Sequence, residues 1–323
     1  MFDLITIGDS LVDIFFVLDE KNSDCIVDLK NKKICFGYAD KMSIEHSTHS
    51  VGGNAANVAV GTQKLGITTA ILTEIGDDIN GQIIFDALQK AKVDTNLIKV
   101  QENQETRYSV VLNYQSERTI LSYHAKRSYT LPNLPDTDWI YYTSLGKSFE
   151  KLQNKLVDHL KKNQKIKLAM NPGSYQFKNG LKKIKEILPL VDLLFLNKEE
   201  AEKMVGKRKD IISLLKEILR TGVKKTVLTD STTGSYSSDG TNFYSMSSYP
   251  IKSLAKTGAG DAYTSGFLSA TILGKNITEA MQWGTANASG VIQKFGAEEG
   301  LLGIRQIQKI IKEYPKITPK HIT

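Results

Sequence analysis

The chain has 323 residues, of which 41% are hydrophobic and 24% are charged, and its formal net charge is +7. This composition is that of a globular protein with room for one large α/β domain or two modest ones, and it excludes a disordered or fibrous chain. The basic residues are scattered without interleaved aromatics and no apolar run reaches about 18 residues, so we expect neither nucleic acid nor a membrane as a partner. Two cysteines, Cys25 and Cys35, and a start without signal-peptide features predict a cytoplasmic protein.

Short apolar runs alternate with amphipathic stretches along the chain. The runs predict strands at residues 4–7, 69–73, 139–143, 166–170, 193–196 and 226–229. Between them, apolar residues at three- and four-residue spacing predict helices, as in 55–65 and 212–219. This alternation favours an α/β fold with a central, mostly parallel sheet flanked by helices. Because no linker divides the chain, we predict a single domain over residues 1–323.

Two stretches break this alternation. Residues 14–51 have little helical periodicity and contain strand-like pieces, and residues 106–124 have the pattern of a hairpin around a polar turn at 114–117. Neither stretch fits a doubly wound core. We therefore predict that both belong to a small β-sheet that projects from the core and covers one end as a lid.

The strongest local motif is the small-residue turn 257–260, which runs into Asp261 and then into helical spacing. The free N–H groups at such a helix start bind anions, and glycines let the backbone approach a phosphate closely. Asp261 is then either a carboxylate that stabilises the helix N-terminus or a general base that takes a hydroxyl proton beside the bound phosphoryl group. A P-loop is excluded because its first glycine would be Tyr141, and a dinucleotide fingerprint because its third glycine would be Tyr263.

Glycines and polar residues also follow other predicted strands. Gly52 and Gly53 precede a helix with Asn57 in its first turn, which suits a polyhydroxyl ligand or a simple capped turn. Asp13 follows the first strand, and its carboxylate either accepts hydrogen bonds from sugar hydroxyls or is a solvated loop residue.

Two more strand ends suit a nucleotide. Asn197 and Glu200 follow the strand 193–196 and either organise water around Mg²⁺ or cap a helix. Thr229, Ser231 and Gly234 follow the strand 226–229 and are typical of a nucleotide loop or of a plain turn.

Together these motifs resemble the ribokinase family of carbohydrate kinases, the phosphofructokinase B type. Residues 52–57 and the following helix resemble its N-terminal signature, and residues 256–261 resemble its C-terminal signature. The two signatures lie about 200 residues apart in the family's order, and the resemblance extends from residue 5 to about residue 301.

The resemblance implies a ribokinase-like fold and an ATP-dependent kinase that uses Mg²⁺. It implies that Asp261 is the catalytic base and that the anion hole consists of Gly258, Ala259 and Gly260. It implies an acceptor site that contains Asp13, Gly52, Gly53 and Asn57. It implies a nucleotide site that contains Asn197, Thr229, Ser231, Gly234 and Asn287, with Glu200 near Mg²⁺ through water. It also implies that two copies pair through their lids.

One departure from the family pattern concerns a monovalent cation. The C-terminal signature usually opens with an aspartate six residues before the base, but here Ala255 and then Lys256 occupy the start. In relatives that use a monovalent cation this aspartate helps to bind it. We therefore do not expect activation by potassium.

The acceptor itself stays open at this level. The leading hypothesis is a small sugar, as for a ribokinase or fructokinase, and the second is a nucleoside of the adenosine type. A sugar phosphate would need extra cations, which Arg107, Lys126 and Arg127 could supply. A non-catalytic regulator that binds a nucleotide or a sugar is the alternative from a different class, but the intact glycine turn and Asp261 argue against it.

Overall fold

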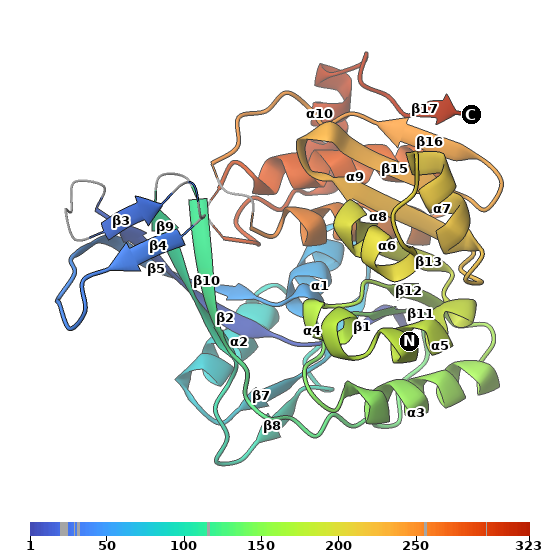
Figure 1. Cartoon of the computed structure of the whole chain (residues 1–323). Helices are drawn as coiled ribbons and strands as arrows, with labels where there is room; N and C mark the ends of the chain where they lie inside the picture. The colour runs from blue at the N-terminus through green and yellow to red at the C-terminus, as the bar shows by residue number, and fades with distance from the viewer. Residues whose placement is uncertain (20–24, 29, 31–32, 115–116, 255–256, 295) are drawn as a thin grey trace.

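The structure, a computed structural model, describes residues 1–19, 25–28, 30, 33–114, 117–254, 257–294 and 296–323. In these residues, a nine-stranded sheet forms the main body, with helices on both faces, and a four-stranded sheet projects to one side (Figure 1). None of the helices in these ranges is long and apolar enough to cross a membrane.

The main sheet contains the six predicted strands as one parallel block. Its order is β17 (Lys320–Ile322), β16 (Phe243–Met246), β15 (Gly234–Ser238), β14 (Lys225–Asp230), β13 (Leu193–Asn197), β12 (Lys167–Met170), β11 (Thr137–Tyr142), β1 (Phe2–Ile7) and β6 (Thr69–Leu72). The strands from β14 to β6 pair in parallel, whereas β15, β16 and β17 add an antiparallel edge. The pattern did not predict this edge because β15 is a polar Gly-Ser-Tyr-Ser-Ser segment.

Helices cover the two faces of this sheet and bury alternate residues of each strand. One layer contains α3 (Phe149–Lys162), α4 (Ser174–Asn179), α5 (Leu181–Ile187), α6 (Lys198–Val205) and α7 (Ile211–Leu219). The other contains α1 (Asn54–Lys64), α8 (Ala259–Ile272), α9 (Ile277–Val291) and α10 (Ile304–Glu313). Ile140 and Tyr142 of β11 pack into the first layer, and Trp139 and Tyr141 into the second. Such two-sided burial explains why these strands are continuous apolar runs.

The smaller sheet is the one predicted from the two irregular stretches. Its order is β10 (Glu117–Tyr123), β9 (Tyr108–Tyr114), β2 (Leu11–Leu18) and β5 (Ile44–Gly52), and it projects to one side of the main body (Figure 1). We call this sheet, with the hairpin of β3 (Cys25–Asp28) and β4 (Lys33–Phe36), the lid. Within the hairpin Cys25 lies opposite Phe36 and Cys35 lies opposite Ile26, so the two free thiols point to opposite faces.

Short elements connect the lid to the core. The helix α2 (Ile79–Lys90) packs with α1 under the inner strands of the lid. A small parallel pair, β7 (Glu74–Gly76) and β8 (Lys99–Gln101), lies beside it. Two 3₁₀ turns, η1 (Leu188–Leu190) and η2 (Ser231–Thr233), complete the described elements.

Candidate active site

The two predicted signatures meet at the start of two neighbouring helices. Asp261 lies in the first turn of α8 and Asn57 in the first turn of α1, and Asn57 Nδ2 donates to Asp261 Oδ2 at 2.7 Å. The two residues are 204 positions apart in the chain. Asn57 is buried and Asp261 is half-buried. The helices α1 and α8 therefore bring an amide and a carboxylate from opposite ends of the sequence to one point.

The environment of Asp261 makes it a better base than an ordinary aspartate. Its pKa is raised to about 6: burial and, to a smaller extent, the charge of Asp13 raise it, and the hydrogen bond from Asn57 opposes them. A carboxylate with a pKa near 6 is ionised at neutral pH and holds a proton more strongly than an exposed one, which suits proton abstraction.

The glycine turn in front of Asp261 exposes bare backbone. Gly258 has φ +78°, and a Cβ there would come within 2.5 Å of the Cβ of Ala297, so only glycine fits. The N-cap of α8 is Gly258, which has no side chain to cap the helix, and in the described part of the chain no atom beyond the neighbouring backbone lies within 4 Å of where a Cβ of Gly260 would be. The first N–H groups of α8 are thus available to an anion.

The predicted acceptor residues lie together at the root of the lid. Asp13 of β2 lies opposite Ser109 of β9, and Gly52 ends β5 opposite Leu11. The pKa of Asp13 is raised to about 6, because burial outweighs the opposing effects of a hydrogen bond from Ser109 and of the charge of Arg118. The carboxylate is therefore held by the lid sheet and lies close enough to Asp261 to affect its pKa.

One contact joins the lid to the glycine turn. Arg118, on the outer strand β10, donates from Nη1 to the hydroxyl of Thr257, the residue before Gly258. The same guanidinium lowers the pKa of Asp13. Arg118 thus spans the space between the predicted acceptor residues and the predicted anion hole, a role that its position in a hairpin did not reveal.

A cavity of about 180 Å³ lies on the other side of the glycine turn. Its lining includes the predicted residues Thr229, Ser231 and Gly234 together with Ala259 and Gly260. The remaining wall is formed by Ser248, Tyr249, Tyr263, Thr285, Ala288, Ser289 and Ile292. The cavity leads from the bare backbone of the turn to a mixed polar and apolar wall, as a nucleotide would require.

Comparison with known proteins fits this geometry. Residues 15–302 match the model of the pfkB family carbohydrate kinase. The chain belongs to this family. It is therefore a carbohydrate kinase that depends on ATP, as the signatures had indicated.

The alignments with two relatives cover most of this chain. The kinase is 24% identical to an ATP-dependent 6-phosphofructokinase from Thermoanaerobacterium thermosaccharolyticum, with 96% of this chain and 94% of the relative covered. It is 27% identical to a 5-dehydro-2-deoxygluconokinase from Bacillus licheniformis, with 81% and 86% covered.

Solved structures show the same fold. The nucleoside kinase of Methanocaldococcus jannaschii superposes with a TM-score of 0.79 at 20% identity, covering 96% of this chain and 98% of that one. The ribokinase of Arabidopsis thaliana, complexed with ribose and ATP, superposes with a TM-score of 0.78 at 19% identity, covering 96% and 99%. The predicted ribokinase-like fold is confirmed.

Asn197 and Glu200 of the kinase cap a helix. The backbone N–H of Glu200 donates to Asn197 Oδ1 at 2.8 Å, and that of Asn197 donates to Glu200 Oε2 at 2.9 Å. Burial raises the pKa of Glu200, and the charge of Asp261 contributes to this shift. The cap therefore also places a carboxylate close enough to Asp261 to interact with its charge.

Asn287 lies apart from the other predicted nucleotide residues. It is fully buried, its Nδ2 donates to the carbonyl of Ala262 and to the hydroxyl of Ser265, and its Oδ1 accepts from Leu302. It ties α8, α9 and the chain before α10 together. Its neighbours in α9 line the cavity instead, and they have no motif that could have identified them. Ala255 and Lys256, on which the expectation about potassium rests, lie outside the described residues.

Proposed function

We propose that the kinase transfers the terminal phosphoryl group of ATP to a hydroxyl of a small sugar, with Asp261 as general base. The observation that carries this proposal is the position of Asp261. Its carboxylate accepts a hydrogen bond from Asn57, and it directly follows the backbone N–H groups of the turn that contains Gly258 and Gly260. A base and an anion site at one helix start suit an attack by a hydroxyl on phosphorus.

The proposed step divides the work between carboxylate and backbone. Asn57 occupies Oδ2 of Asp261, which leaves Oδ1 to take the proton as the acceptor oxygen forms its bond to phosphorus and the bond to ADP breaks. The N–H groups of residues 258–260 stabilise the charge on the transferring group, and the N-terminus of α8 adds to their effect.

We assign the nucleotide to the cavity that contains Thr229, Ser231 and Gly234, with its phosphates toward Gly260 in the same lining. Mg²⁺ would neutralise phosphate charge when bound. Among the described residues no group of three His, Cys, Asp or Glu could hold a metal ion. This fits an ion held mainly by phosphates and water, with the free carboxylate oxygen of Glu200 as a partner through water.

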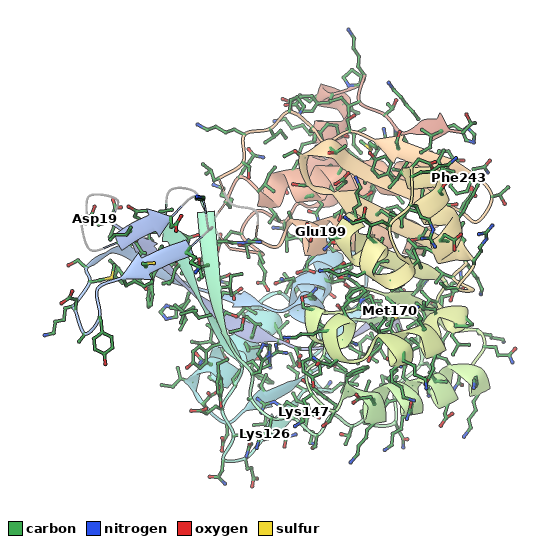
Figure 2. All side chains as sticks on the ribbon, viewed as in Figure 1. Asp19, Lys126, Lys147, Met170, Glu199 and Phe243 are labelled. Atoms are coloured by element: carbon green, nitrogen blue, oxygen red, sulfur yellow. The ribbon has the colours of Figure 1, made fainter. Side chains whose placement is uncertain are left out.

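The buried arginines favour an acceptor without a phosphate group. Arg107 is paired with Asp9, and Arg127 Nη2 donates to the carbonyl of Glu105 at 2.6 Å, so both cations are already engaged. Lys126 is exposed at the base of the lid (Figure 2). A neutral sugar needs only hydrogen-bonding groups, and Asp13, Asn57 and the backbone of the glycine turn 52–53 supply them, which supports the sugar assignment.

The surface of the lid supports a homodimer. Large apolar side chains are exposed on the hairpin, just after it, and on the edge strand β10: Ile26, Phe36, Tyr38, Ile120 and Leu121. Exposed apolar groups beside an unpaired edge are typical of an interface. Light scattering coupled to gel filtration should give twice the chain mass, and Leu121→Asp should shift it to the monomer; a monomeric wild type contradicts this assignment.

The function is tested by measuring ADP release in a coupled assay over pentoses, hexoses, nucleosides and sugar phosphates. We expect turnover with a pentose or hexose and little with the phosphorylated sugars. Turnover with nucleosides alone would mean that the acceptor is a nucleoside and not a sugar. If none of the acceptors in the panel gives ADP release, the proposal is contradicted.

A further inference from the structure

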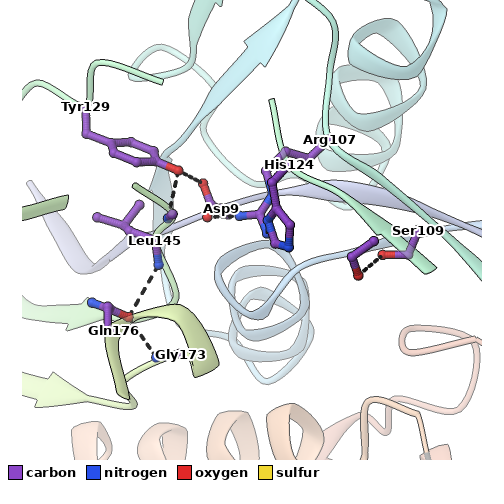
Figure 3. Close-up of polar contacts among 10 residues, drawn as sticks. Asp9, Arg107, Ser109, His124, Tyr129, Leu145, Gly173 and Gln176 are labelled. Atoms are coloured by element: carbon purple, nitrogen blue, oxygen red, sulfur yellow. Dashed lines mark hydrogen bonds and ion pairs between the residues drawn. The ribbon is translucent and has the colours of Figure 1, made fainter. Parts of the chain in front are cut away.

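A buried polar cluster lies at the junction between the lid and the core (Figure 3). Asp9 follows β1 at its carboxyl end and is 1% exposed. One carboxylate oxygen accepts from the hydroxyl of Tyr129 at 2.7 Å, and the other accepts from Nη1 of Arg107. The Tyr129 hydroxyl in turn accepts from the N–H of Gly146 at 2.9 Å. Asp9 is thus fixed to the core from one side and holds Arg107 on the other.

Arg107 belongs to the lid. It directly precedes β9, and its carbonyl accepts from the N–H of Val12 at 3.2 Å. Its Nη2 lies 2.6 Å from Nδ1 of His124, which directly follows β10. A guanidinium only donates, so Nδ1 must accept and the imidazole is neutral. Burial and the charge of Arg107 lower the pKa of His124, which agrees with this tautomer.

The residue before Arg107 is also clamped to the core. Thr106 is fully buried, and its N–H and hydroxyl donate to the two carboxylate oxygens of Asp78 at 2.9 and 2.5 Å. The Thr106 hydroxyl accepts from the N–H of Gly76 at 2.8 Å. Two consecutive residues, Thr106 and Arg107, are therefore bound to the core at the point where the chain enters β9. Together they set the direction of this strand.

The acceptor residues lie next to this clamp. Asp13 follows Val12, which the Arg107 carbonyl holds, and Ser109 lies two residues beyond Arg107 on the same face of the sheet. Gly53 rests on Asp9: with φ +96°, a Cβ there would come within 2.4 Å of the Asp9 carbonyl oxygen. The main chains of the two paired residues thus contact the strand that carries Asp13 and the glycine turn beside it.

We propose that the ion pair of Asp9 and Arg107 is a positioning device that sets the lid, and with it Asp13, at the distance from Asp261 that an acceptor requires. Stability alone does not explain the pair, because two apolar side chains of similar volume usually serve a buried site at least as well. Apolar contacts have no preferred direction, whereas the hydrogen-bonded carboxylate and guanidinium fix the angle between β1 and β9. The inference rests on the proposed function, since Asp13 is taken as an acceptor residue.

The test compares single and paired substitutions. Asp9→Asn keeps the side-chain volume and the bond from Tyr129, and Arg107→Met keeps the apolar stem. Arg107→Met alone should lower Tm because it leaves the Asp9 charge unpaired, and the double variant should recover much of the loss. In the double variant we expect the KM for the acceptor to be raised by about tenfold or more, because small displacements of binding groups are costly, while the KM for ATP and kcat stay within about twofold.

Arg127→Met is the matched control. Arg127 is a buried arginine at the same junction, but its partners are the backbone carbonyls of Glu105 and Lys126. It should lower Tm without changing the KM for the acceptor. A double variant with wild-type KM for the acceptor would show that the pair is only structural and would overturn the inference. If the double variant does not fold, Arg107→Lys, which keeps the charge but not the two-pronged geometry, is judged by the same criterion.

A second measurement separates this inference from the proposed function. Amide hydrogen exchange needs no turnover, so it applies even if no sugar is phosphorylated. Residues 11–18 and 108–114 should exchange about tenfold faster in the double variant than in the wild type, whereas the strands β12 and β13 should not change. Equal exchange in the lid of both proteins would overturn the positioning role.

Discussion

The two sides of the proposed active site are built differently. On the phosphoryl side, one continuous stretch, residues 257–261, supplies backbone N–H groups and the carboxylate of Asp261, and α8 continues from it as a largely buried helix. On the proposed acceptor side, Asp13, Gly52 and Ser109 come from three strands of the lid, which projects to one side of the main body. Local chain geometry fixes the first side, whereas the second depends on how the lid is held. Substitutions on the two sides should therefore change different kinetic constants.

The largest effect is expected at the base. Asp261→Asn should keep ATP binding but lower kcat by about 10²- to 10⁴-fold, since the amide cannot take the hydroxyl proton. Steady-state kinetics with the best acceptor measures this. Asp210→Asn is the control, because Asp210 caps the distant helix α7 and asparagine caps equally well. A variant at position 261 with more than about a third of wild-type kcat would exclude Asp261 as the base.

On the acceptor side the effect should be smaller and should appear in KM. Asp13→Asn should raise the KM for the acceptor by about 10- to 100-fold, since a hydrogen bond to a charged group contributes about 1.5–3 kcal/mol. The KM for ATP should be unchanged. If both constants rise together, the contrast between the two sides is wrong.

The pH profile sharpens the comparison. Asp261 must be ionised to act, and its pKa is about 6, so kcat at saturating acceptor should fall as the pH drops through about 6. The hydrogen bond from Asn57 lowers this pKa, so its removal in Asn57→Leu should move the acid limb to higher pH. An acid limb that stays in place would mean that kcat reports a different group.

The smallest effect is expected from monovalent cations. With alanine at position 255 the carboxylate of the family pattern is missing, and a lysine follows it. Activity should depend on Mg²⁺ but change by less than about twofold between sodium, potassium and a bulky organic cation, because a distant screened charge has little influence. A tenfold increase with potassium would show that a site made mainly of backbone carbonyls replaces the missing carboxylate.

The sequence by itself determined the parallel block of the sheet and the stretch around Asp261. Strands buried on both faces leave continuous apolar runs, and a tight turn at a helix start needs glycine, so both are visible within a few neighbouring residues. The polar strand β15 and the small residues of α9 that line the cavity have no such local signal.

Only the tertiary structure decided which residues meet. The contact between Asn57 and Asp261 spans 204 positions, and the pair of Asp9 and Arg107 spans 98. Both members of the first pair also have an ordinary local interpretation, since Asn57 could belong to a capped turn and Asp261 could stabilise the helix N-terminus. For Asn287, packing likewise decides the partners: its amide hydrogen-bonds with α8 and with the chain before α10. Local patterns report the conformation of the chain, whereas the partner of a side chain depends on packing between segments that the sequence keeps far apart.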